Sequence, residues 1–306
     1  MANLRDISRR MTSIKNTSQV TRTMEMISTA RIRKALDLAE EAYPYKEAIT
    51  RMLANVVLSD PTIKHPLLTK HEEIDTVLYI VIASDRGLAG GFNIVPQRLV
   101  EHEAAELKSK GINVEIITCG RRPTEYFTSR KLTPNMSFVD LSSEPNMDET
   151  MRIASYLMSG YSEGRIDRAE LLYWHAKSRV EQEFVREQIL PISDEALMMP
   201  NVPRKRDALT EVERSATKTE FRFEPSAGEV LESLLPAYVR TVIFHALLDS
   251  AAAEHGARRR AMRSATDSAD EVLGQLSRTY NRVRQGSITT ELTEIIGGAS
   301  ALEDFN

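Results

Sequence analysis

Two long stretches of this chain contain almost none of the residues that end helices. Residues 1–43 contain neither glycine nor proline, and residues 237–296 contain no proline. A helix over the second stretch, which has 60 residues, would be ~90 Å long. Its three glycines, Gly256, Gly274 and Gly286, weaken a helix by roughly 1 kcal/mol each relative to alanine and do not end it. A helix of this length must pack on another elongated element, and the N-terminal stretch is the obvious partner.

The N-terminal stretch begins with apolar residues at a/d spacing, namely Leu4, Ile7, Met11 and Ile14. The same spacing next reaches Ser18 and Thr21, which are polar, so we expect this seam to stop there. A second apolar set should then take over on another side of the helix: Val20, Met24 and Ile27. We expect Pro44 to kink or end the regular helix, and Pro236 to stand in the first turn of the last helix.

Between the two stretches the pattern changes to short apolar runs that alternate with helical segments. Predicted strands cover residues 76–83, 113–119, 136–141, 169–176 and 183–192, and predicted helices cover 94–110, 123–130 and 148–163. This alternation indicates a parallel or mostly parallel sheet with helices on its faces. The stretch "FRFEPSAGE", residues 221–229, is expected to close the sheet and enter the last helix.

The predicted fold class is therefore α/β with long terminal helices. An inserted Rossmann-like domain over residues 75–225 separates an N-terminal helix, residues 1–58, from a C-terminal helix, residues 226–306. The two terminal helices should pair as an antiparallel coiled coil.

Composition excludes several classes of function. The chain has 40 basic and 44 acidic residues in 306, a net charge of −4, and this near balance does not mark the whole chain as a nucleic-acid binder. Its single cysteine, Cys119, forms no internal disulfide and is expected to be buried and inert. The start lacks the apolar core of a secretory signal, and no run of about 18 apolar residues predicts a membrane span.

No catalytic, cofactor-binding or metal-binding site is predicted. The loop "SDRGLAGG" after the first strand lacks both the G-x-G-x-x-G and the G-K-[ST] pattern of phosphate-binding loops. The six histidines show no spacing typical of metal ligands. The missing phosphate loop disfavours a nucleotide-binding enzyme.

The first 35 residues are strongly basic. They contain eight basic and two acidic side chains, a net charge of +6. A solvated helix face is the ordinary explanation. A nucleic-acid site is disfavoured because no aromatic residue lies among these basic residues and because the apolar seam needs a protein partner. A basic helix would be attracted to acidic loops of a surrounding protein.

Three motifs resemble the gamma-subunit family of F-type ATP synthases, and they occur in the same order. They are "SIKNTSQVTRTMEMISTARIRKA" near the start, "SDRGLAGGFN" after the first strand, and "ARRRAMRSATDSA" followed by "YNRVRQGSITTELTEIIGGASA" near the end. The resemblance implies a central-stalk rotor. Its coiled coil would stand inside a ring of three alpha and three beta subunits. Its α/β domain would sit with the epsilon subunit on the membrane-embedded c ring.

The resemblance also implies which residues meet these partners. Contacts with the alpha/beta ring are expected from Met24, Ala89, Arg258, Arg284, Gln285 and Thr289. Contacts with the c ring and epsilon are expected from Phe223 and Glu224. Proton or sodium flow would drive rotation. Because the start does not resemble an organellar transit peptide, we expect a peripheral protein on the cytoplasmic face of a bacterial plasma membrane.

Two other classes of protein remain as alternatives. A nucleotide- or substrate-binding α/β enzyme with coiled-coil arms is disfavoured by the missing phosphate loop, and predicts micromolar ATP binding. A generic coiled-coil scaffold predicts self-association through the helices, whereas a rotor predicts one copy in a three-fold ring.

Overall fold

A computed structural model describes residues 4–59, 63–141, 145–193, 197, 223–224 and 226–303. The chain divides into two compact units. Residues 28–258 form the first, which we call the sheet unit, and residues 1–27 with 259–306 form the second, which we call the helical unit. These units cut across the three predicted segments, because the helices α1 (Leu4–Ser59) and α7 (Ala227–Glu303) each contribute to both.

The sheet unit contains a five-stranded, mostly parallel sheet in the order β3-β2-β1-β4-β5. Its strands are β1 (Thr76–Ile82), β2 (Asn113–Cys119), β3 (Met136–Phe138), β4 (Arg168–His175) and β5 (Glu183–Leu190). Its shorter helices are η1 (Pro66–Leu68), α2 (Ile94–Ser109), α3 (Arg121–Ser129) and α4 (Met147–Ser162). Strands β1 to β4 are parallel, and β5 pairs antiparallel with β4. The predicted strands and helices are confirmed, although β3 is shorter than expected.

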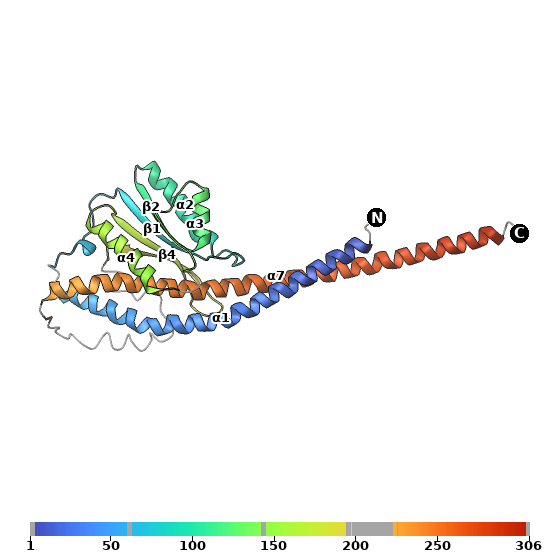
Figure 1. Cartoon of the computed structure of the whole chain (residues 1–306), viewed down its shortest axis with the longest axis horizontal. Coiled ribbons are helices and arrows are strands. Elements are labelled where there is room, and N and C mark those ends of the chain that lie inside the picture. The colour runs from blue at the N-terminus through green and yellow to red at the C-terminus, as the bar shows by residue number, and fades with distance from the viewer. Residues whose placement is uncertain are drawn as a thin grey trace. The chain divides into compact units, whose positions relative to one another are not determined.

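Both faces of the sheet are buried, and β1 shows how. Its alternate residues belong to two hydrophobic clusters, with Tyr79 in one and Leu78 and Ile80 in the other. The first cluster is completed by α2 and α3 through Val100 and Phe127. The second is completed by α1, α4 and α7, and Figure 1 shows these helices on the opposite side of the sheet from α2 and α3. A strand covered on both faces carries a continuous apolar run, which is why β1 is recognisable in the sequence.

The position of Pro236 within α7 differs from the prediction, although α7 begins close to the predicted residue 226. Pro236 lies inside α7, in its third turn rather than its first. The cause is packing, because Leu231 and Leu235 are buried in the core and hold the turns before the proline. The carbonyl of Pro236 also accepts a hydrogen bond from Nε of Arg240, at 3.1 Å. Pro44 likewise lies within α1, which continues to Ser59.

One helix in the described part of the chain, α7, meets the length and composition of a membrane span. Its most apolar 18-residue window has a mean hydropathy of 1.3, but 56% of that window is buried inside the protein. A helix that crosses a hydrophobic core passes the same test, and α7 crosses the core of the sheet unit.

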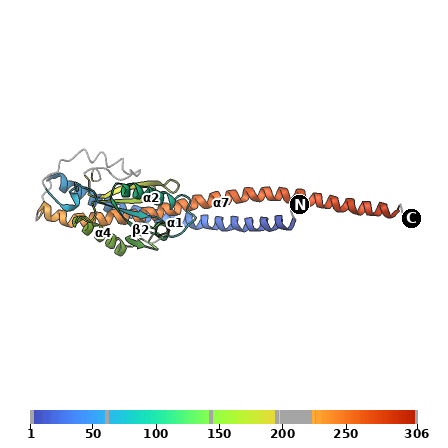
Figure 2. The ribbon, with the colours of Figure 1, turned by 90° about the horizontal axis from the view of Figure 1, so that it is seen from above.

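Helices α1 and α7 run antiparallel in the helical unit (Figure 2). The seam between them corrects one prediction. Thr21 and Thr266 are hydrogen-bonded through their hydroxyl oxygens at 2.6 Å, and Ser18 donates to Oδ1 of Asp270 at 2.8 Å. Residue numbers therefore fall along α1 where they rise along α7, which is the antiparallel arrangement. The a/d seam does not stop at Ser18 and Thr21 but runs through them, because hydroxyl hydrogen bonds replace apolar contacts.

The second apolar set faces outward instead of forming a new seam. Val20 is 59% exposed and Ile27 is 50% exposed, whereas Met24 between them is half-buried. Since residues 20, 24 and 27 share one face of a helix, they form an apolar stripe beside the seam. We call Val20, Met24 and Ile27 the α1 stripe.

Cys119 ends β2 and is fully buried, as expected. Burial raises the pKa of its thiol, so the reactive thiolate is suppressed. We predict that Ellman's reagent will not label the native protein and will label one thiol per chain in denaturant. The control is Leu88→Cys in a Cys119→Ala background, because Leu88 is 61% exposed and should react at once. Full labelling of native wild-type protein at the control's rate would contradict a closed core at β2.

Candidate functional site

The carboxyl ends of β1 and β4 mark the place where an α/β sheet of this order usually binds a ligand. The strand order reverses direction between these two strands, and such a switch point commonly forms a crevice. Here the protein fills it. The loop between β1 and α2 folds onto α7, and Ala89 and Phe92 pack against Ala252 and Ala253. Trp174 of β4 closes the contact, since its indole N–H donates to the carbonyl of Phe92 at 2.9 Å.

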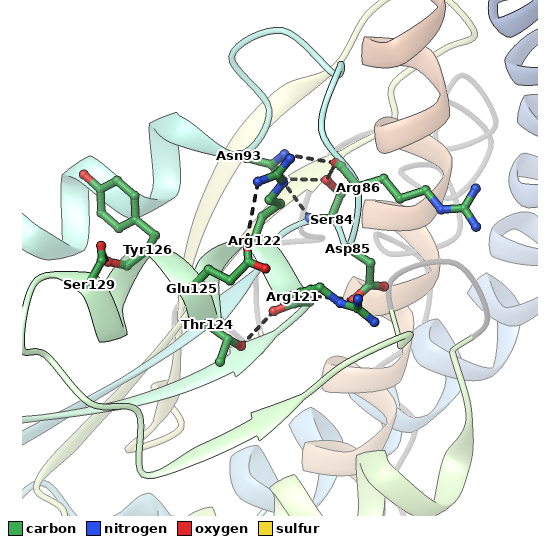
Figure 3. Close-up of polar contacts among 11 residues, drawn as sticks. Ser84, Asp85, Arg86, Asn93, Arg121, Arg122, Thr124, Glu125, Tyr126 and Ser129 are labelled. Carbon is green, nitrogen blue, oxygen red and sulfur yellow. Dashed lines mark hydrogen bonds and ion pairs between the residues drawn. The ribbon is translucent and has the colours of Figure 1, made fainter.

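We call residues 84–93 the β1 loop. Asn93 ties its two ends together, because Oδ1 of Asn93 accepts from the backbone N–H and the hydroxyl of Ser84, both at 2.8 Å. Figure 3 shows Ser84 and Asn93 turned toward each other and the side chain of Arg86 pointing away from them. Gly90 has a φ of +59°, a conformation that glycine adopts without strain. The loop therefore has a defined shape.

The neighbouring strand ends brace the same loop. Oδ1 of Asp85 accepts from the backbone N–H of Arg121 and of Asp140, each at 2.8 Å. The backbone N–H of Arg122 donates to the carbonyl of Ser84 at 3.1 Å. These bonds fix the β1 loop to the segments that follow β2 and β3.

Arg258 connects the β1 loop to α7. Its Nη1 lies 2.7 Å from Oε1 of Glu254, one turn earlier in the helix. Its Nη2 donates to the carbonyls of Arg86 and Gly87, each at 3.4 Å. Arg258 is 8% exposed and Glu254 is 4% exposed, so the pair is buried. In this structure the guanidinium binds groups of its own chain.

Two further residues mark the same part of α7. Gly256 lets the tip of the β4–β5 hairpin approach the helix, because a Cβ there would lie 2.3 Å from Nε2 of Gln182. His255 is buried beside two arginines. Burial, followed by the positive charges of Arg258 and Arg31, lowers the pKa of His255 to about 4. His255 is therefore neutral near neutral pH.

The other expected ring contacts lie in the helical unit. Met24 belongs to the α1 stripe. Arg284, Gln285 and Thr289 are exposed on α7, and the hydroxyl of Thr289 donates to the carbonyl of Gln285 at 2.9 Å within the helix. From Ile288 to residue 299 every residue is exposed.

That exposed part includes four large aliphatic side chains. Ile288 is 48% exposed, Leu292 54%, Ile295 67% and Ile296 64%. We call these four residues the α7 tip stripe. They recur at spacings of four, three and one, so they share one side of the helix.

The register between the helices explains why this stripe is uncovered. The pairs Thr21–Thr266 and Ser18–Asp270 place Leu4, the first residue of α1, opposite residue 283 or 284 of α7. The α7 tip stripe therefore lies beyond the described part of α1.

The two expected foot residues lie just before α7. Phe223 is half-buried and packs against the core of the sheet unit, whereas Glu224 is exposed. Neither belongs to a strand, and Phe221, Arg222 and Pro225 of the expected closing segment lie outside the described residues. Within the described ranges, no group of three or more His, Cys, Asp or Glu could hold a metal ion.

Ala89 and Arg258 were predicted to lie at a partner interface, and their contacts within the chain were not predicted. The signals were present in "SAAAEHGARRR", residues 250–260. The alanines and Gly256 permit close approach of other segments, and Glu254 precedes Arg258 by one helical turn, where opposite charges attract. The carbonyl partners of Arg258 could not be found, because they lie 172 and 171 residues away in the chain.

The fold and the site define a class of protein. In the sequence, an α/β domain stands between two long chain-terminal helices. The β1 loop of this domain packs with α7 at the place where such a sheet usually binds a ligand. A family model described as ATP synthase matches residues 3–302. The chain therefore belongs to the ATP synthase family.

Solved structures share this fold. A chain of the Euglena gracilis mitochondrial ATP synthase (OSCP/F1/c-ring, rotational state 3) is 17% identical, with a TM-score of 0.63 over 98% of this chain and 94% of that chain. The rotor of the same enzyme in rotational state 1 is 16% identical, with a TM-score of 0.60 over 93% and 98%. The central stalk/c-ring of the Tetrahymena thermophila enzyme is 20% identical, with a TM-score of 0.57 over 80% and 99%.

The buried His255 predicts a pH dependence of stability. Its pKa is lowered from 6.5 to about 4 in the folded chain, so the unfolded chain binds the proton more readily. The free energy of unfolding should therefore fall as the pH falls from 6.5 toward 4. We predict that His255→Gln will reduce this loss, measured by urea unfolding across the range. The exposed His102→Gln is the control and should leave the slope unchanged. A His255→Gln slope equal to that of the wild type would contradict the predicted burial.

Proposed function

We propose that this chain is the central-stalk rotor subunit of an F-type ATP synthase. Membership of the ATP synthase family and the fold shared with central-stalk chains support this role. The observation that carries it is the uncovered end of α7, where every residue from Ile288 to 299 is exposed and the α7 tip stripe is apolar. A single helix is marginal in water without packing, so this end needs a partner that surrounds it.

We propose the alpha and beta subunits, three of each, as that partner. Met24 would reach them as part of the α1 stripe, and Arg284, Gln285 and Thr289 as exposed groups on α7. Met suits a surface that meets similar partners in turn, because its side chain is flexible and polarizable. Ala89 and Arg258 are buried in the sheet unit, so we propose that they support such a contact by shaping the β1 loop.

We propose that residues 1–58 and 226–306 act as the shaft and residues 75–225 as the foot. Phe223 and Glu224 would lie where the foot meets the c ring and the epsilon subunit. The chain would be non-catalytic, with nucleotide chemistry performed by other subunits, and peripheral to the membrane that holds the c ring. The solved relatives named above are mitochondrial, and a bacterial plasma membrane stays a prediction.

The alternatives have less support. A nucleotide-binding enzyme would need an open crevice at the switch point, which Ala89, Phe92 and α7 fill. A generic coiled-coil scaffold is not favoured by the family match across residues 3–302.

Stoichiometry tests the proposal. The chain, affinity-tagged and expressed in its own cells, should co-purify with three alpha and three beta subunits per copy, measured by native mass spectrometry. Isolation as a self-associated oligomer without those subunits would favour the scaffold instead.

We predict that Arg284→Ala with Gln285→Ala will damage coupling more than nucleotide binding. Both side chains are exposed on α7, and a charge-assisted hydrogen bond to a ring subunit would contribute roughly 1.5–3 kcal/mol. ATP-driven ion pumping and hydrolysis are measured on the same membranes, and nucleotide affinity on the isolated complex. Pumping should fall while affinity stays near normal.

Arg282→Ala is the charge-matched control. Arg282 is also exposed, and it lies about 200° around the helix from Arg284 but only about 60° from Gln285, so it is compared with Arg284→Ala alone as well as with the double variant. Wild-type pumping by the double variant, or equal losses in the double variant and the control, would remove Arg284 and Gln285 from the proposed contact.

A further inference from the structure

The bond pattern of Arg258 links two parts of the sheet unit that are far apart in sequence. One end of its guanidinium pairs with Glu254 of α7, and the other donates to two consecutive carbonyls, those of Arg86 and Gly87. A planar guanidinium with five donors can hold both sides at once, which the single ammonium of lysine cannot do in the same geometry.

The contact is buried, which makes it consequential. The side chains of Arg258 and Glu254 are 9% and 5% exposed. A buried charge pair gives little net stability, but removal of one partner leaves an uncompensated charge. Such a pair is better suited to fixing a geometry than to stabilising the fold.

The β1 loop has an apolar contact with α7 beside this polar one. Ala89 is 2% exposed and belongs to the same apolar cluster as Ala252, Ala253 and Ala257 of α7. The tip residue Leu88, by contrast, is 61% exposed and has a φ of +63°. The loop thus meets α7 through small side chains, and Arg258 supplies the directional bonds.

The position of Arg258 in the chain adds significance. Arg258 is the last residue of a continuous buried run of α7, residues 245–258, and Arg259 after it is half-buried. Earlier turns of α7 are held by large buried side chains such as Leu235 and Val239, whereas at the β1 loop the apolar contact is made by small side chains, which do not interlock deeply. The hydrogen bonds of Arg258 to the carbonyls of Arg86 and Gly87 add directional contacts there, each at 3.4 Å.

We infer that Arg258 is a positioning residue that fastens the β1 loop to α7 and holds the last buried turn of this helix in register with the loop. It does so at the end of the buried run of α7. The second part of its test rests on the proposed rotor function, because a loosely held α7 would transmit torque incompletely.

The first experiment uses the isolated full chain. A single reporter thiol is placed by Ala89→Cys in a Cys119→Ala background, and its rate of reaction with Ellman's reagent reports opening of the β1 loop. The test variant is Glu254→Leu with Arg258→Met, which removes both buried charges and avoids the cost of leaving one unpaired. Its thermal midpoint should therefore stay near that of the parent.

The reporter should react roughly tenfold faster in this double variant, because hydrogen bonds to charged groups no longer hold the loop closed. Arg258→Lys should give an intermediate rate. Arg263→Met, which removes an exposed arginine of α7, is the control and should leave the rate unchanged. A second form of Glu254→Leu/Arg258→Met keeps Cys119 and lacks the reporter thiol. Its Cys119 should stay unreactive, which shows that the core at β2 is closed. An unchanged reporter rate would show that Arg258 does not fasten the β1 loop to α7. We call this fastening the Arg258 clamp.

The second experiment uses the assembled complex on membranes, without the reporter thiol. The ratio of ions pumped to ATP hydrolysed should fall at least twofold in Glu254→Leu/Arg258→Met, while hydrolysis continues and Arg263→Met matches the parent. A faster reporter with an unchanged ratio would show a clamp without a role in coupling and would overturn the positioning claim. If the parent chain does not assemble into a rotary complex, the proposed function fails, and the first experiment still decides the clamp.

Discussion

The packing of the first half of α7 against the sheet and α1 is the interaction on which the rest of the structure depends. Leu235, Val239, Ile243 and Leu247 are each at most 1% exposed and share one core with Ile80 of β1. This burial holds α7 helical past Pro236. Further along α7, Ala252 and Ala253 lie in one apolar cluster with Ala89 of the β1 loop, at the strand ends where a sheet of this order commonly binds a ligand. The sheet unit therefore holds a helix at this place.

The second half of α7 has the opposite character. Its seam with α1 is made partly of hydroxyl pairs, and the register ends before the α7 tip stripe. The α1 stripe also faces away from the seam, with Val20 and Ile27 exposed. Exposed aliphatic side chains that no described element covers indicate a protein interface. The same chain thus has one region built for rigid attachment and another built to meet a partner.

The sequence predicted the sheet well because strands buried on both faces carry apolar runs with little ambiguity. The sequence-based prediction failed where polar residues occupy positions that an apolar pattern would fill. Ser18 and Thr21 continue the seam through hydrogen bonds that no hydrophobic pattern reveals, and Pro236 is tolerated because of packing from distant segments. The candidate site was predicted through resemblance. The internal partners of Arg258 were not predictable, since they are backbone carbonyls brought close only by the fold.

Direct observation of rotation is the measurement that tests the central claim. A bead attached to a cysteine placed in the foot, in a complex immobilised through its beta subunits, would report movement of this chain during ATP hydrolysis. The proposed role predicts rotation in one direction, with three equal steps per turn that match a three-fold ring. Continued hydrolysis with the bead stationary, or with only random rotational diffusion, would contradict a rotor.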